Sequence, residues 1–413
     1  MREPCALTGS EAPGSGPSAA PPPPGAAESG GPLEYFGRMI DHCYEFAEAA
    51  KGQGRPIVGI MCEFTPREVI LAAGAAPVCL CGGAAATIPA AEQHLPANLC
   101  PLIKSTYGYH VTRANPFLQW ADLVVAETTC DGKKKMFELL AADKPMYVLE
   151  LPQKADEPDA LEHWVGEVRK LKAHLEARFK VEITDAKLRA AIQLMNRERR
   201  LRRELAELMA AEPPPLTGRQ LLEFKSIISG IEADLQQYAA ALAWFDGANR
   251  GRSPPTGGGP PGAKVRVLLT GVPLVHGAER VLELIEGSGA VVVCQENCTG
   301  LKPLLEEVDL EGPDPLRAIA DKYYHLPCSV MTRNERRLET LRSLAARFRP
   351  HCVIELVWQA CLTYDVESCH VRRLAEEELR LPYLKLTTDY SPADSARIRA
   401  RVTALVETVV RKA

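Results

Sequence analysis

Cysteines at the ends of predicted strands are the residues of this chain best suited to chemistry. Cys130 lies in the segment 127–132, ETTCDG, after an apolar β-branched run that predicts a buried strand and before a predicted helix. The carboxyl end of a strand is where open α/β sheets bind ligands. A helix N-terminus also lowers a thiol pKa and favours the thiolate, which is the form that binds metal. One cysteine in such a turn is usually a packing residue, so recurrence decides the interpretation.

The same arrangement recurs along the chain. Three further cysteines directly follow predicted strands, and two adjoin a proline in predicted loops: Cys62, Cys298 and Cys361, then Cys100 and Cys328. Proline beside a ligand fixes the backbone and removes a competing N–H donor. No C-x-x-C pair occurs, which disfavours zinc ribbons and ferredoxin-type clusters. Scattered single ligands suit a cluster held between two domains, and six thiolates suffice for two cubanes with three ligands each. Spacing alone leaves inert packing equally open.

Other residues near these cysteines have simpler interpretations. Cys79 and Cys81 alternate onto one face of a predicted strand, and we expect both to be packing residues. Three acids lie beside candidate ligands, namely Glu63, Glu127 and Glu296. They are candidate proton donors to a substrate. Alternatively, these acids cap helices or pair with lysines 133–135. For the lysines themselves, we expect either docking of a partner or a solvated helix face.

Composition limits the class of protein. The chain has 413 residues, enough for two or three domains of about 150 residues each. A net charge of −4 disfavours binding to nucleic acid or an anionic membrane. No apolar run approaches the ~20 residues of a membrane span, and no signal-peptide pattern is present. We therefore expect a soluble, cytoplasmic protein, in which thirteen cysteines favour metal or redox chemistry over disulfides.

The chain divides into five segments by composition. Residues 1–31 are rich in Pro, Gly, Ala and Ser and predict a disordered tail, whereas 247–263 predict a Gly/Pro-rich linker. Residues 32–155 and 264–413 alternate short strands with helices. Residues 156–246 have helical periodicity, with helices near 161–179, 185–211 and 218–245 and an arginine-rich run at 197–203 expected to be solvated. This helical segment is a candidate for contact between subunits.

These patterns predict an α/β fold. We expect two Rossmann-like or flavodoxin-like parallel-sheet domains, with the helical segment inserted between them. Thr65 and Glu68 have the spacing of a capping box at the start of a helix. Neither a G-x-G-x-x-G dinucleotide fingerprint nor a phosphate loop is present.

Three segments resemble the 2-hydroxyacyl-CoA dehydratase/benzoyl-CoA reductase subunit family: 59–68 (GIMCEFTPRE), 130–135 (CDGKKK) and 361–367 (CLTYDVE). The resemblance covers roughly residues 33–413 and leaves out the Pro-rich tail; the linker is not part of the family pattern either. Four more segments look more like the double-cubane cluster protein branch: 98–101 (NLCP), 296–300 (ENCTG), 327–328 (PC) and 388–391 (TDYS).

The branch implies two [4Fe–4S] cubanes joined by a bridging sulfide, in a homodimer served by a separate ATP-dependent iron–sulfur activator. Dehydratase-type members hold one cubane with three cysteines, which Cys62, Cys130 and Cys361 match; the other three would hold a second cubane. The implied function is a reductase that passes low-potential electrons from the activator to a small substrate. The alternatives are a 2-hydroxyacyl-CoA dehydratase or benzoyl-CoA reductase type subunit with one [4Fe–4S] cluster, and a non-enzymic electron-transfer protein.

Overall fold

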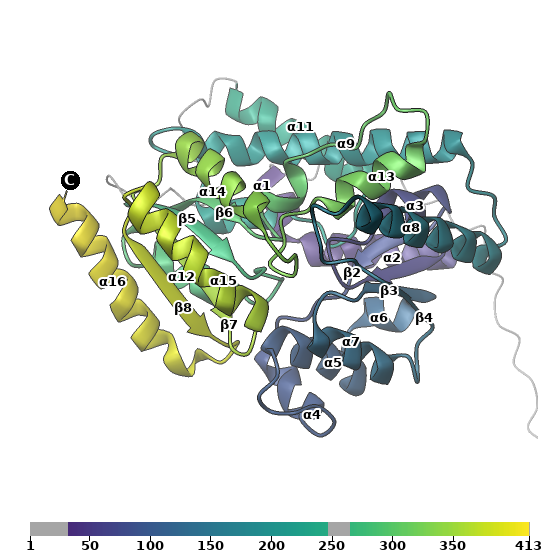
Figure 1. Ribbon diagram of the computed structural model, residues 1–413, viewed down its shortest axis with the longest axis horizontal. Coiled ribbons are helices and arrows are strands. Elements are labelled where there is room, and N and C mark those ends of the chain that lie inside the picture. Colours follow the sequence, from purple (N-terminus) through teal and green to yellow (C-terminus); the bar gives the residue numbers. More distant parts are fainter. Residues whose placement is uncertain (1–31, 247–264, 413) are drawn as a thin grey trace, which may run out of the picture.

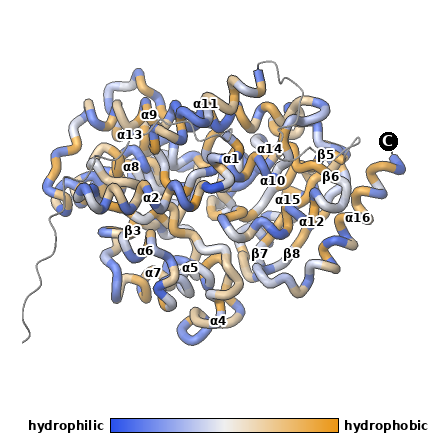
Figure 2. The backbone as a smooth tube through the Cα atoms, turned by 180° about the vertical axis from the view of Figure 1, so that it is seen from behind, coloured by the Kyte–Doolittle hydropathy of each residue, from blue (hydrophilic) through white to orange (hydrophobic). Residues whose placement is uncertain are grey.

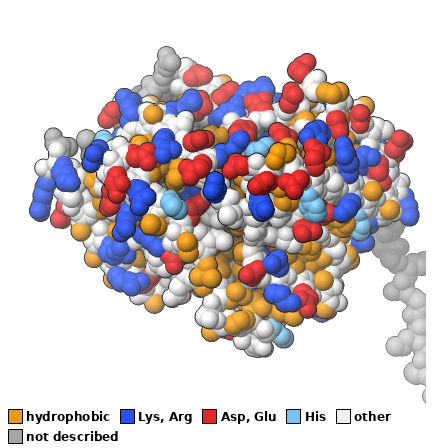
Figure 3. Space-filling view, in the orientation of Figure 1, with side chains coloured by type: hydrophobic (Ala, Val, Ile, Leu, Met, Phe, Trp, Pro, Cys, Tyr) orange, Lys and Arg blue, Asp and Glu red, His pale blue; other side chains and the backbone are white. Residues whose placement is uncertain are grey.

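The computed structural model describes residues 32–246 and 265–412 (Figure 1). The predicted tail at 1–31 and the linker at 247–263 lie outside the described residues. On the face seen in Figure 3, acidic and basic side chains are interspersed, in keeping with the small net charge. Among the described helices, none combines the length and the apolar character that a bilayer crossing requires.

Two four-stranded sheets form the centre of the structure, and every strand pairing within them is parallel. The first has the order β2-β1-β3-β4, built from β1 (Ile57–Ile60), β2 (Ala76–Cys79), β3 (Leu123–Glu127) and β4 (Met146–Leu149). The second has the order β6-β5-β7-β8, built from β5 (Val265–Gly271), β6 (Ala290–Glu296), β7 (Cys352–Trp358) and β8 (Tyr383–Thr388). The two sheets repeat one strand order, so the predicted fold class is confirmed.

Helices cover both sheets. The first unit carries α1 (Pro32–Gly37), α2 (Met39–Gly52), α3 (Arg67–Ala72), α4 (Ile88–Ala91), α5 (Pro101–Thr112), α6 (Pro116–Trp120) and α7 (Asp131–Leu140). The middle segment carries α8 (Pro158–Phe179), α9 (Asp185–Glu207), α10 (Gly218–Glu223) and α11 (Glu232–Asp246). The second unit carries α12 (Arg280–Glu286), α13 (Pro315–Tyr324), α14 (Glu335–Phe348), α15 (Leu362–Arg373) and α16 (Ser395–Lys412). Hydrophobic residues concentrate in the sheets and hydrophilic residues in the outer helices (Figure 2).

The two units interlock through their helices. Helix α9 runs along the helical layer shared by both units (Figure 1). Its Leu188 packs into the core beside the first sheet and its Leu205 into the core beside the second. Helix α13 follows the second unit's strands in the chain, yet it packs against α8, where the indole of Trp164 donates to the Ala320 carbonyl at 3.1 Å. Because each core contains residues from both halves of the chain, the units are held in a defined relation to each other.

The predicted helix at 218–245 is wrong in one respect. Helix α10 ends at Glu223 and α11 begins at Glu232, and the residues between them run along the edge of the first sheet. There the Cys79 amide donates to the Ile227 carbonyl at 2.8 Å. Gly230 adopts φ 79°, a left-handed conformation that ends the helical pattern. Helical periodicity gave the wrong prediction here because isoleucines fit a helix as well as an extended segment paired with a sheet edge.

The arginine-rich run is also not fully solvated as predicted. Arg199 is buried, and its guanidinium donates to Glu68 at 2.6 Å and to the Tyr323 hydroxyl at 3.0 Å. These partners lie on α3 and α13, which are far from Arg199 in the sequence. A buried ion pair of this kind ties α9 to both neighbouring helices, because either partner left alone would be a costly buried charge.

The turn after β5 requires glycine. Gly271 has φ 111°, and a Cβ added there would lie 2.1 Å from the Leu356 carbonyl oxygen of β7. We expect Gly271→Ala to lower the free energy of unfolding by about 2–4 kcal/mol, from backbone strain and this clash with main chain. Denaturant unfolding measures the loss. Gly52→Ala is the control, because nothing lies within 4 Å of a Cβ at Gly52; equal losses in both variants would contradict the prediction.

Candidate metal centre

A cavity of about 770 Å³ lies at the carboxyl ends of strands from both sheets. It is lined by the residues that follow β1, β2, β3, β5, β6 and β7. All six cysteines singled out in the sequence line this one cavity: Cys62, Cys100, Cys130, Cys298, Cys328 and Cys361. We call it the cysteine chamber. Side chains that lie up to 299 positions apart in the chain therefore meet at one place.

Three of the chamber cysteines stand at helix starts. Cys100, Cys130 and Cys361 are the N-cap residues of α5, α7 and α15, and none of their side chains makes a capping hydrogen bond. Their sulfurs are therefore not used by the helices they begin. Three helix N-termini directed at one chamber favour negative charge inside it, as a thiolate or a thiolate-bound cluster would supply.

The thiols of the two units interact with each other. The Cys361 thiol shares a hydrogen bond with Cys100, which lowers the pKa of Cys100 and raises that of Cys361. Cys62, Cys298 and Cys328 interact electrostatically with one another. Each group combines cysteines from both units. The resemblance grouped Cys62 with Cys130 and Cys361 instead, so the interactions of these five thiols follow a different grouping.

Burial keeps three of the chamber thiols protonated in the absence of a cation. It raises the pKa of Cys62 and of Cys298 to about 12 and that of Cys328 to about 11. Lys133 and Lys302 oppose this effect only in part. Thiol ligands lose their protons when metal binds, so occupation of the chamber by a cationic centre would release protons.

The donor set of the chamber fits an iron–sulfur cluster. In the part of the chain that the structure describes, no three His, Cys, Asp or Glu side chains converge as the ligands of one metal ion. The chamber instead distributes six thiols around a volume of about 770 Å³. Thiolate sulfur is the donor that holds iron–sulfur clusters, which are larger than a single ion. The residues present are therefore suited to such a group.

Two further cysteines, which the sequence pattern assigned to packing, also line the chamber. Cys79 and Cys81 are half-buried, share a side-chain hydrogen bond, and both face this cavity. The Cys81 thiol also donates to the Met61 carbonyl at 3.4 Å. Alternation correctly placed Cys79, the last residue of β2, and Cys81 just beyond it on one face, but it could not show that this face meets a cavity rather than a helix.

Lys133 lies inside the chamber rather than on the solvated helix face expected for 133–135. Its ammonium donates to the Met61 carbonyl at 2.6 Å and lines the cavity. Burial opposes its charge, yet the neighbouring Cys62 and Cys81 raise its pKa overall. Lys134 stays exposed and pairs with Asp131 at 2.8 Å. Lys133 is therefore a fixed positive charge beside the thiols.

Of the three candidate proton donors, only Glu63 lines the chamber. Burial by itself would raise its pKa, but ion pairs with Arg67 at 2.8 Å and Lys225 at 3.4 Å lower the pKa to about 2. Glu63 is therefore ionised near neutral pH. Glu296 is fully buried behind the chamber, held by Lys302 at 3.1 Å and Arg337 at 3.3 Å.

Glu127 has a different environment. It is fully buried, and burial raises its pKa to about 7. The Thr65 hydroxyl donates to it, whereas the sequence predicted that this hydroxyl would cap α3. Helix α3 begins at Arg67 with no side-chain cap at Pro66, so the capping box is wrong. Thr65 and Glu127 are both buried, so the hydroxyl and the carboxyl satisfy each other's hydrogen-bonding needs.

We expect Glu127→Gln to stabilise the fold at alkaline pH. The pKa of Glu127 rises from its ordinary value of 4.5 to about 7 on folding, so stability falls between pH 4.5 and pH 7, where the unfolded state ionises first, and the amide does not suffer this loss. The variant should gain up to about 3 kcal/mol at pH 8.5 and nothing at pH 4, where both states are protonated. Denaturant unfolding at the two pH values measures this difference. An equal effect at both would contradict it.

A buried ionic cluster behind the chamber was not foreseen. Arg337 of α14 has no exposed surface and contacts three carboxylates, including Glu296 at 3.3 Å and Glu355 at 3.2 Å. Its third partner is Glu367 of α15. The guanidinium also lies 4.9 Å from the ring of Tyr364, which lines the chamber. This buried ionic cluster connects the chamber wall to two helices and two strands of the second unit.

The fold and the cavity together define an α/β protein in which two parallel-sheet units enclose a thiol-lined chamber. The family model described as 2-hydroxyglutaryl-CoA dehydratase, D-component, matches residues 62–409. The chain belongs to this family, and the family resemblance inferred from the sequence is confirmed.

Named relatives agree with this assignment. The YjiM protein of Escherichia coli (strain K12), a presumed dehydratase subunit, is 39% identical over 86% of this chain and 92% of its own length. The beta subunit of the lactoyl-CoA dehydratase of Anaerotignum propionicum is 29% identical over 39% of this chain and 42% of its own length. One of the benzoyl-CoA reductase subunits of Thauera aromatica is 23% identical over 66% and 68% respectively. Relatives of this chain are thus named as dehydratase and reductase subunits.

Proposed function

We propose that this chain is an iron–sulfur reductase that holds a double-cubane cluster in the cysteine chamber. It would take low-potential electrons from a separate ATP-dependent activator and pass them to a small substrate. One observation carries the proposal: six cysteines from both units line a single cavity of about 770 Å³. Six thiolates provide three ligands for each of two cubanes.

The six chamber cysteines would hold the cluster, which when bound supplies one-electron chemistry at low potential. The surrounding residues suit an anionic centre, because Lys133 and the N-termini of α5, α7 and α15 place positive charge around the thiols. Burial and these charges would set the potential at which electrons are accepted.

Proton delivery is proposed for the acids next to the ligands. Glu127 is the best placed electrostatically, because a pKa of about 7 lets it carry a proton near neutral pH. Glu63 faces the chamber as a carboxylate and would instead hold Lys225 at 3.4 Å. Glu296 would contribute to proton delivery through its ion pairs with Lys302 and Arg337.

The partner would be an external activator, and we propose a homodimer as the assembly. The relatives named as dehydratase and reductase subunits belong to proteins of more than one part, which supports a partner for this chain. An opening for electron entry is supported by Leu362, which lines the chamber and is 70% exposed. Val366, one turn further along α15, is 74% exposed.

The second candidate function is a dehydratase-type subunit with one [4Fe–4S] cluster, favoured by the names of the relatives. Such a subunit would act on a CoA thioester and hold iron for a single cubane. A non-enzymic electron-transfer protein is the third, and it would be reduced without turning over any small molecule.

Spectroscopy on the anaerobic protein tests the proposed function. With the activator and ATP present, we expect an EPR signal of a reduced cluster that is absent when either is omitted. Addition of a small reducible substrate should then discharge the signal without any CoA thioester. A signal that only a CoA thioester discharges would favour the dehydratase, and reduction with no discharge by any compound would favour electron transfer alone. A protein that gives no signal at all would end the proposal.

A further inference from the structure

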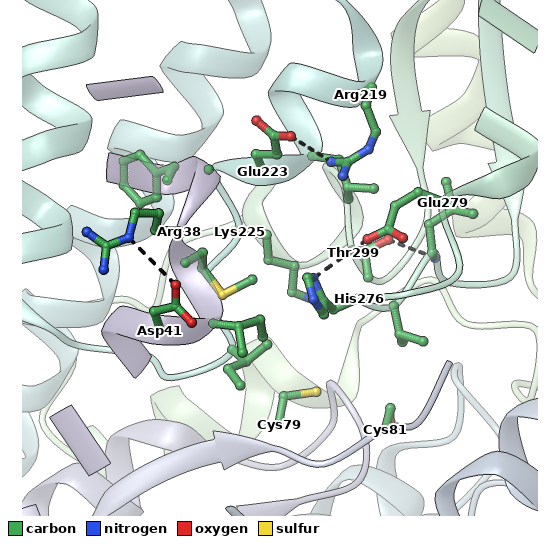
Figure 4. Close-up of a pocket in the computed structure, with 18 residues that line it drawn as sticks. Arg38, Asp41, Cys79, Cys81, Arg219, Glu223, Lys225, His276, Glu279 and Thr299 are labelled. Carbon is green, nitrogen blue, oxygen red and sulfur yellow. Dashed lines mark hydrogen bonds and ion pairs between the residues drawn. The ribbon is translucent and has the colours of Figure 1, made fainter. Parts of the chain in front are cut away.

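A second cavity adjoins the cysteine chamber. It has a volume of about 380 Å³ and lies between α1, α2, α10 and the turn after β5 (Figure 4). Five residues line both cavities and so form the wall between them: Cys79, Cys81, Lys225, Val275 and Thr299. We call this second space the antechamber. A molecule held in it therefore lies next to the chamber.

The wall contains the thiols that the proposed cluster does not require. Cys79 and Cys81 face the antechamber as well as the chamber (Figure 4), and the two thiols interact with each other. Lys225 stands beside them, with its ammonium 3.2 Å from the Cys298 carbonyl and 3.4 Å from Glu63. A flexible lysine and two small thiols make a wall that a side-chain movement can open.

The antechamber presents cations only in ion pairs. Three pairs line it: Arg38 with Asp41 at 3.6 Å, Arg219 with Glu223 at 3.0 Å, and His276 with Glu279 at 3.7 Å (Figure 4). The third cation, Lys225, is held by Glu63, and the imidazole of His276 carries a charge only when it is protonated. Because each cation that lines the cavity already has a carboxylate partner, an anion entering it would find no uncompensated positive charge.

The remaining lining is apolar and the volume is small. Phe36, Met39, Leu222 and Leu274 are buried side chains that face the cavity. A volume of about 380 Å³ is at the low end of small-molecule sites, which run from about 300 to 1,000 Å³. A group with the several negative charges of a nucleotide diphosphate fits neither this size nor this charge pattern.

From these features we infer that the antechamber binds small molecules without net charge and is their route to the cysteine chamber, past Cys79 and Cys81. The inference extends the proposed function, since it assigns the substrate class and its entrance. It does not depend on how many cubanes the chamber holds.

Selective alkylation of the anaerobically purified full-length protein tests the route. Neutral iodoacetamide and anionic iodoacetate are applied separately, and labelled cysteines are identified by mass spectrometry. Cys369, which is exposed on α15 and outside both cavities, is the internal reference. We expect iodoacetamide to label Cys79 or Cys81, and iodoacetate to label them about tenfold more slowly relative to Cys369, which is a barrier difference of about 1.4 kcal/mol.

A filled antechamber should close the route. Gly37 ends α1 and lines the antechamber, with nothing within 4 Å of an added Cβ, so Gly37→Phe places a ring there without a backbone clash. We expect it to slow iodoacetamide labelling of Cys79 and Cys81 about tenfold, whereas Gly52→Phe, at the equivalent end of α2 but outside the cavity, should not.

Two results would overturn the inference: labelling of Cys79 and Cys81 that Gly37→Phe leaves unchanged, or iodoacetate reacting as fast as iodoacetamide relative to Cys369. Iron content is measured on the same samples. A protein without iron whose labelling still depends on Gly37 would refute the proposed function and support the antechamber route. A protein with iron whose labelling does not depend on Gly37 would refute the route and leave the proposed function standing.

Discussion

Cys298→Ala is expected to lose iron equivalent to at least one cubane. The Cys298 sulfur lies in the group with Cys62 and Cys328, at the exit of β6, whereas the two additional chamber thiols, Cys79 and Cys81, come from the end of β2 and the residues after it. Loss of one of three ligands leaves a cubane with too few thiolates to stay bound. Iron and acid-labile sulfide assays on anaerobically purified protein measure the effect.

Two further variants make this result specific. Cys369→Ala removes an exposed thiol outside the chamber and should keep all of its iron. Cys361→Ala should lose iron whether the chamber holds one cubane or two, since the family resemblance assigns Cys361 to the single cubane. If Cys298→Ala keeps the full iron content while Cys361→Ala does not, the two-cubane assignment fails and the one-cubane alternative stands.

The second large effect concerns stability. Arg337→Leu is expected to lower the free energy of unfolding by about 3–5 kcal/mol, because it leaves buried carboxylates without their cation. Glu296 and Glu355 are fully buried, and Arg337 donates to both. A loss of this size is a large part of the total stability of a typical domain, so soluble yield should also fall. Denaturant unfolding, or thermal unfolding where yield is low, measures it.

Arg342→Leu is the matched control. Arg342 lies on the same helix, α14, and pairs with Glu378 at 2.8 Å, but both side chains are more than two-fifths exposed. Exposed pairs contribute about 0–1 kcal/mol, so this variant should stay close to the unmodified protein. Equal losses in the two variants would mean that the buried cluster contributes no more than a surface pair does.

The sequence predicted the parts of the structure that local pattern controls. Apolar β-branched runs identified the strands, and the strand-to-helix turns identified Cys62, Cys130 and Cys361 because a parallel sheet brings its carboxyl ends to one edge. The edge pairing of residues 224–231 was missed, since isoleucines with a serine and a glycine fit a helical period as well as an extended strap.

Features that depend on distant partners could not be predicted. Arg199 and Arg337 look like solvated helix charges in the sequence, and only the packed structure shows the carboxylates that bury them. Lys133 sits next to two exposed lysines, yet its own side chain points to the Met61 carbonyl. Cys79 and Cys81 were placed on the correct face, but nothing local indicates that two cavities meet there.

The most direct measurement is the iron and acid-labile sulfide content per chain of anaerobically purified protein, combined with EPR after reduction. We predict iron for two [4Fe–4S] cubanes in each chain and an EPR spectrum that differs from that of one isolated cubane. Iron for a single cubane would favour the dehydratase-type alternative. A protein that carries neither iron nor sulfide after anaerobic purification and reconstitution would contradict the central claim that the chamber holds a cluster.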